Sequence, residues 1–124
     1  MAIFLVSIVA LFFLIMGLWA LFLTDSFADL VGFSLDVDRG PNEIRAVYGG
    51  FGIAMAIMAW GAVFSSPPAL GLLTALAIAL VGMAAGRMVS MMIEGGVPIY
   101  GLLAGTGELA LACALFWSIN LLSV

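Results

Sequence analysis

Residues 43–52 read EIRAVYGGFG, and they lie where a long apolar run begins. They bring a carboxylate, a guanidinium, a phenol and several glycines to the start of a segment, residues 46–64, that carries no charge. At about 1.5 Å per residue, that segment is close to the minimum length that crosses a hydrocarbon core of about 30 Å. The stretch therefore predicts a membrane-spanning helix with a polar opening.

The composition of the whole chain supports a membrane protein. Of its 124 residues, 66% are hydrophobic and only 8% are charged, whereas soluble domains carry about 25% charged residues. The chain has no histidine and one cysteine, Cys113, so the commonest general base and metal ligand and any internal disulfide are missing. We expect Cys113 to be buried. A net charge of -4 without a basic run makes nucleic acid an unexpected partner. These features predict no enzymatic activity, no catalytic or metal-binding residues and no cofactor.

Further apolar segments, separated by turn residues, predict the fold class. The prediction is an all-α, four-helix antiparallel transmembrane bundle that forms a single integral membrane domain over residues 1–124. Its helices are expected at about 2–24, 43–64, 69–93 and 98–122, with turns at 65–68 and 94–98. The first segment could also be a signal peptide. The lack of a positive n-region and an apolar run longer than about 15 residues favour a retained helix.

The long polar connection after the first helix predicts a short helix at the membrane interface. Ser26 and Asp29 have the spacing of a capping pair. Phe27, Leu30 and Val31 would share the apolar face of this helix, and the glycine at position 32 would end it.

Two carboxylates, Asp36 and Asp38, follow in the same connection. Their spacing is compatible with a divalent cation, but it does not continue into a calcium-loop pattern. A solvated turn is therefore the favoured interpretation.

Small residues at helical spacing predict where helices approach one another closely in lipid. The longest such series lies on the third helix, where glycine, alanine and serine recur every three or four residues between positions 71 and 90. The glycines expected to pack helices together are Gly49, Gly50, Gly71, Gly82, Gly86, Gly101 and Gly105.

Arg87 and Glu108 lie inside apolar helices that are neighbours along the chain. Intramembrane charges are costly and usually pair within a bundle, so we expect these two to meet. They are predicted to belong to one polar cluster, near the 25–42 loop, made of Glu43, Arg45, Tyr48, Arg87, Glu94 and Glu108. The favoured interpretation is a pairing that fixes helix register. The alternatives are the mouth of a ligand pocket and a proton path through Glu108.

The run of residues 42–50, NEIRAVYGG, resembles the signature of an uncharacterised bacterial family, the domain of unknown function number four-three-four-five. This family is related in architecture to the DoxX-like proteins. The Gly86-Arg87 pair, the 94–96 turn and Glu108 are similar to its later motif. The resemblance implies a four-helix inner-membrane protein without an established activity. The family residues that it implies are Glu43, Arg45, Tyr48, Gly49, Gly50, Arg87 and Glu108.

Three classes of function follow. The favoured one is a small, multi-pass protein of the bacterial inner membrane that serves as an accessory or assembly subunit of a larger membrane complex. Its expected partners are the lipid bilayer and other membrane-protein subunits or further copies of the chain. The second is a binder or carrier of a lipid-like, quinone-like or anionic ligand in a pocket lined by Arg and Glu. A proton-coupled exporter is disfavoured, because residues 2–23 contain no carboxylate. Arginine placement favours the 25–42 loop in the cytoplasm.

Overall fold

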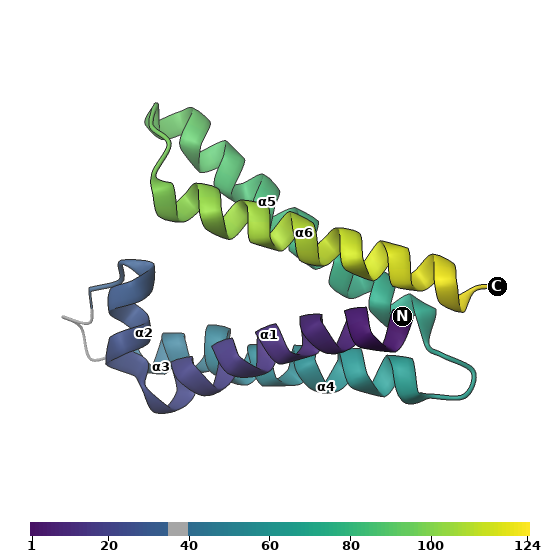
Figure 1. Cartoon of the computed structure of the whole chain (residues 1–124). Helices are drawn as coiled ribbons and strands as arrows, with labels where there is room; N and C mark the ends of the chain where they lie inside the picture. The colour runs from purple at the N-terminus through teal and green to yellow at the C-terminus, as the bar shows by residue number, and fades with distance from the viewer. Residues whose placement is uncertain (35–39) are drawn as a thin grey trace. The chain divides into compact units, whose positions relative to one another are not determined.

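The computed structural model describes residues 1–34 and 40–124, except for the side chain of Glu94. Throughout this part of the chain, helices are joined by turns and short connections, without a strand (Figure 1). The elements are α1 (Ala2–Phe22), α2 (Thr24–Val31), α3 (Gly40–Ile44), the π-helix η1 (Arg45–Gly50), α4 (Phe51–Phe64), α5 (Leu70–Glu94) and α6 (Ile99–Leu122).

Four helical segments are long and apolar enough to cross a membrane: Ala2–Phe22, Gly40–Phe64, Leu70–Ile93 and Ile99–Leu122. The second comprises α3, η1 and α4 in continuous succession. At most 39% of the residues in the apolar window of any span are buried, so lipid is the natural solvent for the remainder. The predicted all-α membrane fold, with a short helix after the first span, is confirmed.

The chain forms two compact units. One comprises residues Ser7–Trp60, and the other comprises Met1–Val6 together with Gly61–Val124. The first contains α2, α3, η1 and most of α1 and α4, and the second contains α5 and α6.

In the first unit, α1 approaches the second spanning helix at glycines. A Cβ added to Gly17 of α1 would lie 2.8 Å from the carbonyl oxygen of Gly49 and 2.8 Å from the amide nitrogen of Ile53. A Cβ on Gly52 would lie 3.0 Å from the Cα of Gly17. Backbone therefore meets backbone at this crossing, which is the contact that small residues permit in lipid. Nearer the other end of α1, Trp60 Nε1 donates a hydrogen bond to Ser7 Oγ at 3.2 Å.

The second spanning helix contains a feature that the sequence did not predict, the π-helical turn η1. Along the second spanning helix, the buried positions are five residues apart across the π-turn, from Ile44 to Gly49. Beyond the turn they are three and four residues apart, at Gly52 and Ala56. The additional residue in the π-turn changes which side of the helix is buried. Gly50, which was expected to pack helices together, is instead exposed. Two adjacent glycines weaken the local preference for a regular α-helix by about 1 kcal/mol each, so packing can determine the backbone here.

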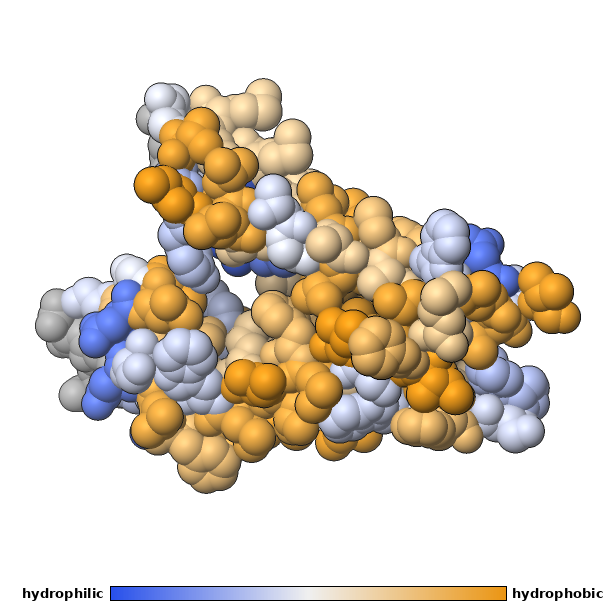
Figure 2. All heavy atoms as spheres, viewed as in Figure 1, coloured by the Kyte–Doolittle hydropathy of each residue, from blue (hydrophilic) through white to orange (hydrophobic). Residues whose placement is uncertain are grey.

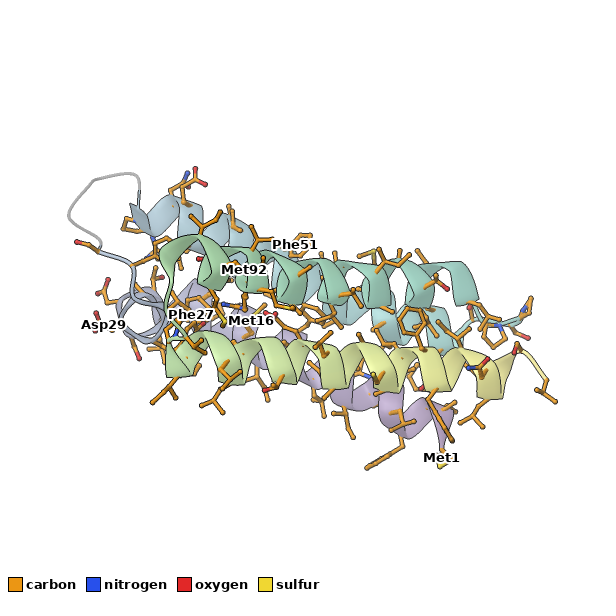
Figure 3. The ribbon with its side chains drawn as sticks, turned by 90° about the horizontal axis from the view of Figure 1, so that it is seen from above. Met1, Met16, Phe27, Asp29, Phe51 and Met92 are labelled. Atoms are coloured by element: carbon orange, nitrogen blue, oxygen red, sulfur yellow. The ribbon has the colours of Figure 1, made fainter. Side chains whose placement is uncertain are left out.

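The short helix α2 is amphipathic, as expected. Phe27 and Ala28 are buried, and Figure 3 shows Phe27 close to Met16 of α1, with Asp29 on the outer side of α2. Gly32 ends the helix with a left-handed φ of 76°, so that prediction is confirmed. Leu30 is 50% exposed, which an apolar face directed toward lipid permits.

The predicted cap of α2 was wrong. The helix begins at Thr24, so Ser26 lies within its first turn rather than ahead of it. Ser26 Oγ instead accepts a hydrogen bond from Trp19 Nε1 of α1 at 3.3 Å.

In the second unit, α5 and α6 run side by side along most of their length (Figure 1). Leucine and alanine side chains of α5, including Leu73, Leu76 and Leu80, are buried, as is Leu115 of α6. Gly95 ends α5 with a left-handed φ of 68°, which confirms the turn predicted after Glu94. This hairpin brings the polar residues of the two helices to the same level.

Candidate functional site

The most strongly connected polar group of the second unit is an ion pair between α5 and α6. Arg87 Nε donates to both carboxylate oxygens of Glu108, at 3.0 and 3.1 Å, and Arg87 Nη2 donates to Oε1 at 2.9 Å. Glu108 is 4% exposed and Arg87 is 28% exposed. Both oxygens of the buried carboxylate therefore accept from the guanidinium, in the forked geometry that makes Arg–carboxylate pairs strong. The structure brings this predicted pair together.

The guanidinium also lies over an aromatic ring. The Cζ atom of Arg87 is 5.6 Å from the centroid of Tyr100, at the start of α6. This distance is within the range of a cation–π interaction. The sequence analysis did not predict this role for Tyr100. The signal that could have found it is the spacing of eight residues between Tyr100 and Glu108, which brings both toward one side of α6.

Two glycines of α6 lie next to side chains of α5. A Cβ on Gly105 would lie 3.7 Å from Arg87 Cδ, an ordinary van der Waals distance. A Cβ on Gly101 would lie 2.9 Å from Cε of Met91 and 3.3 Å from Cγ of Pro98. Both glycines therefore lie next to side chains rather than backbone, and the closest atom at Gly101 is the end of a flexible methionine.

The site is an ion pair whose two opposite charges cancel. Among the described residues, no buried side-chain nitrogen or oxygen lacks a hydrogen-bond partner. A charge placed alone at the centre of a membrane helix costs about 2.5–3.5 kcal/mol on insertion scales. Because Arg87 and Glu108 neutralise each other across two helices, their contact favours one rotational and axial register of α5 against α6.

A second polar group lies in the first unit, where α1 turns into α2. Arg45 Nε donates to Thr24 Oγ1 at 3.1 Å and to the Leu21 carbonyl at 3.4 Å. Thr24 is 4% exposed, and its hydroxyl donates to the Ala20 carbonyl at 2.9 Å. Gly49 permits this approach, since a Cβ there would lie 3.3 Å from Leu21 Cβ. Arg45 and Gly49 thus connect the π-turn to the end of α1.

Tyr48, in the same turn, belongs to an aromatic group. Its ring centroid is 5.1 Å from that of Phe27 and 6.2 Å from that of Phe33. Phe27 in turn lies 6.1 Å from Trp19 in an edge-to-face arrangement. This group packs α2 against α1 and η1, together with the buried Ile44.

The remaining members of the predicted cluster are placed as follows. Glu43 is exposed in α3, and Glu94 is the last residue of α5, with a side chain outside the described part. Asp36 and Asp38 lie outside the described residues, so the turn and cation interpretations stay predictions. A single cluster spanning both units also stays a prediction. No group of three or more possible metal ligands occurs among the residues that the structure describes.

The glycines of α5 are placed differently from those of η1 and α6. A Cβ on Gly71, Gly82 or Gly86 would meet no atom within 4 Å, and all three positions are exposed. They make no close helix contact within their unit, where larger side chains form the packed face. Cys113 is exposed on α6, so its expected burial was wrong. Spacing identified a common face on α5 but could not identify what that face contacts.

Fold and site together define a multi-pass α-helical membrane protein with an interhelical ion pair. A family model described as Domain of unknown function (DUF4345) matches residues 1–119. The chain therefore belongs to this family, as the resemblance of the 42–50 run predicted. No curated protein and no solved structure matched the chain.

Proposed function

We propose that this membrane protein is a non-enzymatic accessory or assembly subunit of a larger complex in the bacterial inner membrane. The observation that carries the proposal is the division of α5 into two faces. Leucines such as Leu76 and Leu80 are buried, whereas Gly82 and Gly86 are exposed and have open space around them. A glycine face permits close approach by another transmembrane helix, and a helix of another subunit is the occupant that we propose.

The ion pair supports the same proposal, because its carboxylate is already engaged by hydrogen bonds. The Glu108 carboxylate is buried and accepts hydrogen bonds from Arg87 through both oxygens. A carboxylate engaged in this way is suited to holding α5 and α6 in register. Proton transfer through Glu108 would require this fork to open. We therefore favour a structural role for the pair over a catalytic or proton-carrying one.

Gentle extraction from the native membrane tests the proposal. The wild-type chain is expected to migrate with a defined complex much larger than itself. A variant with Gly82→Leu and Gly86→Leu fills the open face and is expected to leave that complex while remaining in the membrane. Gly107→Leu is the matched control, because Gly107 of α6 is also exposed with no atom within 4 Å of an added Cβ.

Two results would contradict the proposal. The wild-type chain could migrate alone or only with copies of itself, which mixed populations carrying two different tags would reveal. The glycine-face variant could also stay in the complex as fully as the control variant does. Either result would favour the second candidate, a carrier of a lipid-like, quinone-like or anionic ligand.

One observation favours part of that second candidate. Arg45 is exposed, and its described hydrogen bonds both leave from Nε. An arginine anchored in this way retains donors for an anionic group. Enclosure of a whole ligand would additionally require a cavity. Retention of a small molecule in native mass spectrometry would be the evidence for a carrier.

A further inference from the structure

The end of α1 is capped by an arginine from the second spanning helix. The last carbonyl groups of a helix lack intrahelical N–H partners and carry partial negative charge. Arg45 Nε donates to one of them, the Leu21 carbonyl, at 3.4 Å, and to Thr24 Oγ1 at 3.1 Å. Thr24 is buried, and its hydroxyl donates to the Ala20 carbonyl. One of the three guanidinium nitrogens therefore sets the position of the Arg45 side chain.

The other two guanidinium nitrogens of Arg45 are not used in this way. Within the part of the chain that the structure describes, the hydrogen bonds of Arg45 leave from Nε, and it forms no ion pair. Its side chain is exposed. The two Nη groups form an edge with parallel N–H donors in a fixed plane, which matches the oxygens of a phosphate. Because Nε is already anchored, the side chain would lose less conformational entropy on binding a ligand.

The backbone that carries Arg45 is also unusual. Arg45 is the first residue of the π-helix η1, and π-turns are rare features that occur frequently at functional sites. In the same turn, Gly49 packs against Leu21, where an added Cβ would lie 3.3 Å from Leu21 Cβ. The turn is thus in close contact with the residue whose carbonyl Arg45 caps. This packing brings the guanidinium to the end of α1.

The end of α1 is a boundary between polar and apolar parts of this unit. One predicted span ends at Phe22 and the next begins at Gly40, so Arg45 lies near the ends of both. The amphipathic α2 begins here, and the hydrophilic residues of this unit gather around it (Figure 2). Farther into the two spans, Leu18 is 41% exposed and Phe51 is 48% exposed. Phospholipid phosphates lie at such a boundary, with their acyl chains beside the apolar side chains.

We propose that the terminal nitrogens of Arg45 bind the phosphodiester group of one phospholipid. Its acyl chains lie along the exposed apolar side chains of α1 and α4, so the lipid stays in the bilayer and needs no enclosing cavity. The phosphate is the group that the guanidinium recognises, and this phosphate is common to phospholipids with different headgroups. The inference goes beyond the accessory function and concerns the first unit, whereas the proposed partner helix contacts α5. Either proposal can fail without the other.

Native mass spectrometry of the delipidated protein in detergent tests this inference. The protein is titrated with three lipids of identical acyl chains, which carry a phosphoglycerol, a phosphocholine or a glucose headgroup. The wild-type chain is expected to retain one molecule of either phospholipid about tenfold more tightly than the glucose lipid, which lacks a phosphate. Arg45→Gln is expected to remove this difference, and Arg45→Lys, which keeps the charge without the planar edge, should keep part of it.

A matched pair of variants at Thr24 tests the anchoring of the guanidinium. Thr24→Val keeps the shape of the side chain and the charge of Arg45 but removes the hydroxyl that accepts from Nε. It is expected to reduce the preference for the phospholipids several-fold, because the side chain is no longer fixed. Thr24→Ser keeps the hydroxyl and should keep the preference. Circular dichroism of each variant reports whether it folds.

Solid-state NMR of the wild-type chain in phospholipid bilayers gives a readout that a purely structural cap would not produce. With nitrogen-labelled arginine, dipolar coupling to the lipid phosphorus is expected at the Nη nitrogens of Arg45 and is expected to be weaker at its Nε. Comparison with Arg45→Lys, which lacks these nitrogens, assigns the coupled signals to Arg45. This measurement does not depend on the folding of Arg45→Gln.

Four results would overturn the inference. Equal retention of all three lipids by the wild-type chain would show that the phosphate is not recognised. Tight binding of the phosphoglycerol lipid alone would indicate a general attraction for net negative charge. A preference that Thr24→Val leaves undiminished, or a spectrum without phosphorus coupling at Arg45, would remove the anchored contact. Displacement of the lipid by millimolar inorganic phosphate, which binds in its place, would identify a free anion as the ligand.

Discussion

Removal of one member of the Arg87–Glu108 pair should destabilise the α5–α6 hairpin strongly. In Glu108→Leu, the guanidinium loses contacts at 2.9, 3.0 and 3.1 Å. Breaking a buried ion pair from one side costs about 3–5 kcal/mol in proteins generally. The uncompensated charge, rather than the lost attraction, dominates this cost.

The position of Arg87 places the expected destabilisation near the lower end of this range. Its side chain is 28% exposed, and seven residues separate it from the end of α5, about 10 Å of helix. A long arginine side chain can extend part of that distance toward the headgroups. We expect a loss of about 3 kcal/mol for Glu108→Leu. Glu108→Gln keeps one acceptor and should lose about half as much.

A double-mutant cycle separates pairing from local packing. Replacing both residues by leucine removes both charges, and such replacements are often neutral or stabilising. The double variant is therefore expected within about 1 kcal/mol of wild type, with a coupling energy of about 2 kcal/mol or more. Arg87→Glu combined with Glu108→Arg should likewise recover expression lost by either single change.

Reversible unfolding in mixed detergent micelles, followed by circular dichroism, measures these free energies. If the free-energy changes of Arg87→Leu and Glu108→Leu simply add in the double variant, the pairing argument is refuted. A charge-swapped protein that folds no better than the single variants would do the same. Recovery in both double variants would support an interhelical ion pair as the determinant of register.

Three further predictions concern packing, the cation–π contact and orientation. Gly17→Ala should lower the free energy of unfolding by about 1–3 kcal/mol, because the added methyl group overpacks a backbone crossing. Gly61→Ala, which has open space at Cβ, should lower it by less than about 0.5 kcal/mol. Equal unfolding midpoints for the two variants would contradict the close crossing. Tyr100→Leu should lose about 0.5–2 kcal/mol of cation–π attraction, whereas Tyr100→Phe keeps it, and equal losses in the same unfolding assay would assign the effect to the hydroxyl. In a Cys113→Ser background, Asn42→Cys should react with an impermeant maleimide only after the cells are opened; labelling of intact cells would place this loop outside.

The sequence predicted the spans because lipid restricts the possible structures. Backbone groups inside a bilayer must bond within a helix, so long apolar segments define helices almost without reference to packing. The Arg87–Glu108 contact was predictable for a related reason, since a lone charge in that position is costly. The turn glycines at positions 32 and 95 were predictable from their freedom to adopt positive φ.

Other features depend on packing, which spacing alone does not determine. Both Gly49 and Gly50 were expected to pack, but the π-turn places Gly49 and Gly52 on the packed face and leaves Gly50 exposed. Spacing also found a common face on α5 without identifying its contacts. Tyr100 was missed because an isolated tyrosine near a helix end resembles an interface anchor. Its partner becomes evident only when α5 and α6 are paired.

Solid-state NMR of the protein in lipid bilayers tests the central claim most directly. The chain has only three arginines and three glutamates, so nitrogen-labelled arginine and carbon-labelled glutamate give a small set of possible contacts. The nitrogen–oxygen distance of 2.9 Å in the pair implies a guanidinium-to-carboxyl-carbon distance of roughly 3.5 Å. We expect one strong dipolar coupling at this distance, absent in Glu108→Gln. A wild-type spectrum without it, in which the Arg87 nitrogens couple only to lipid, would contradict the account.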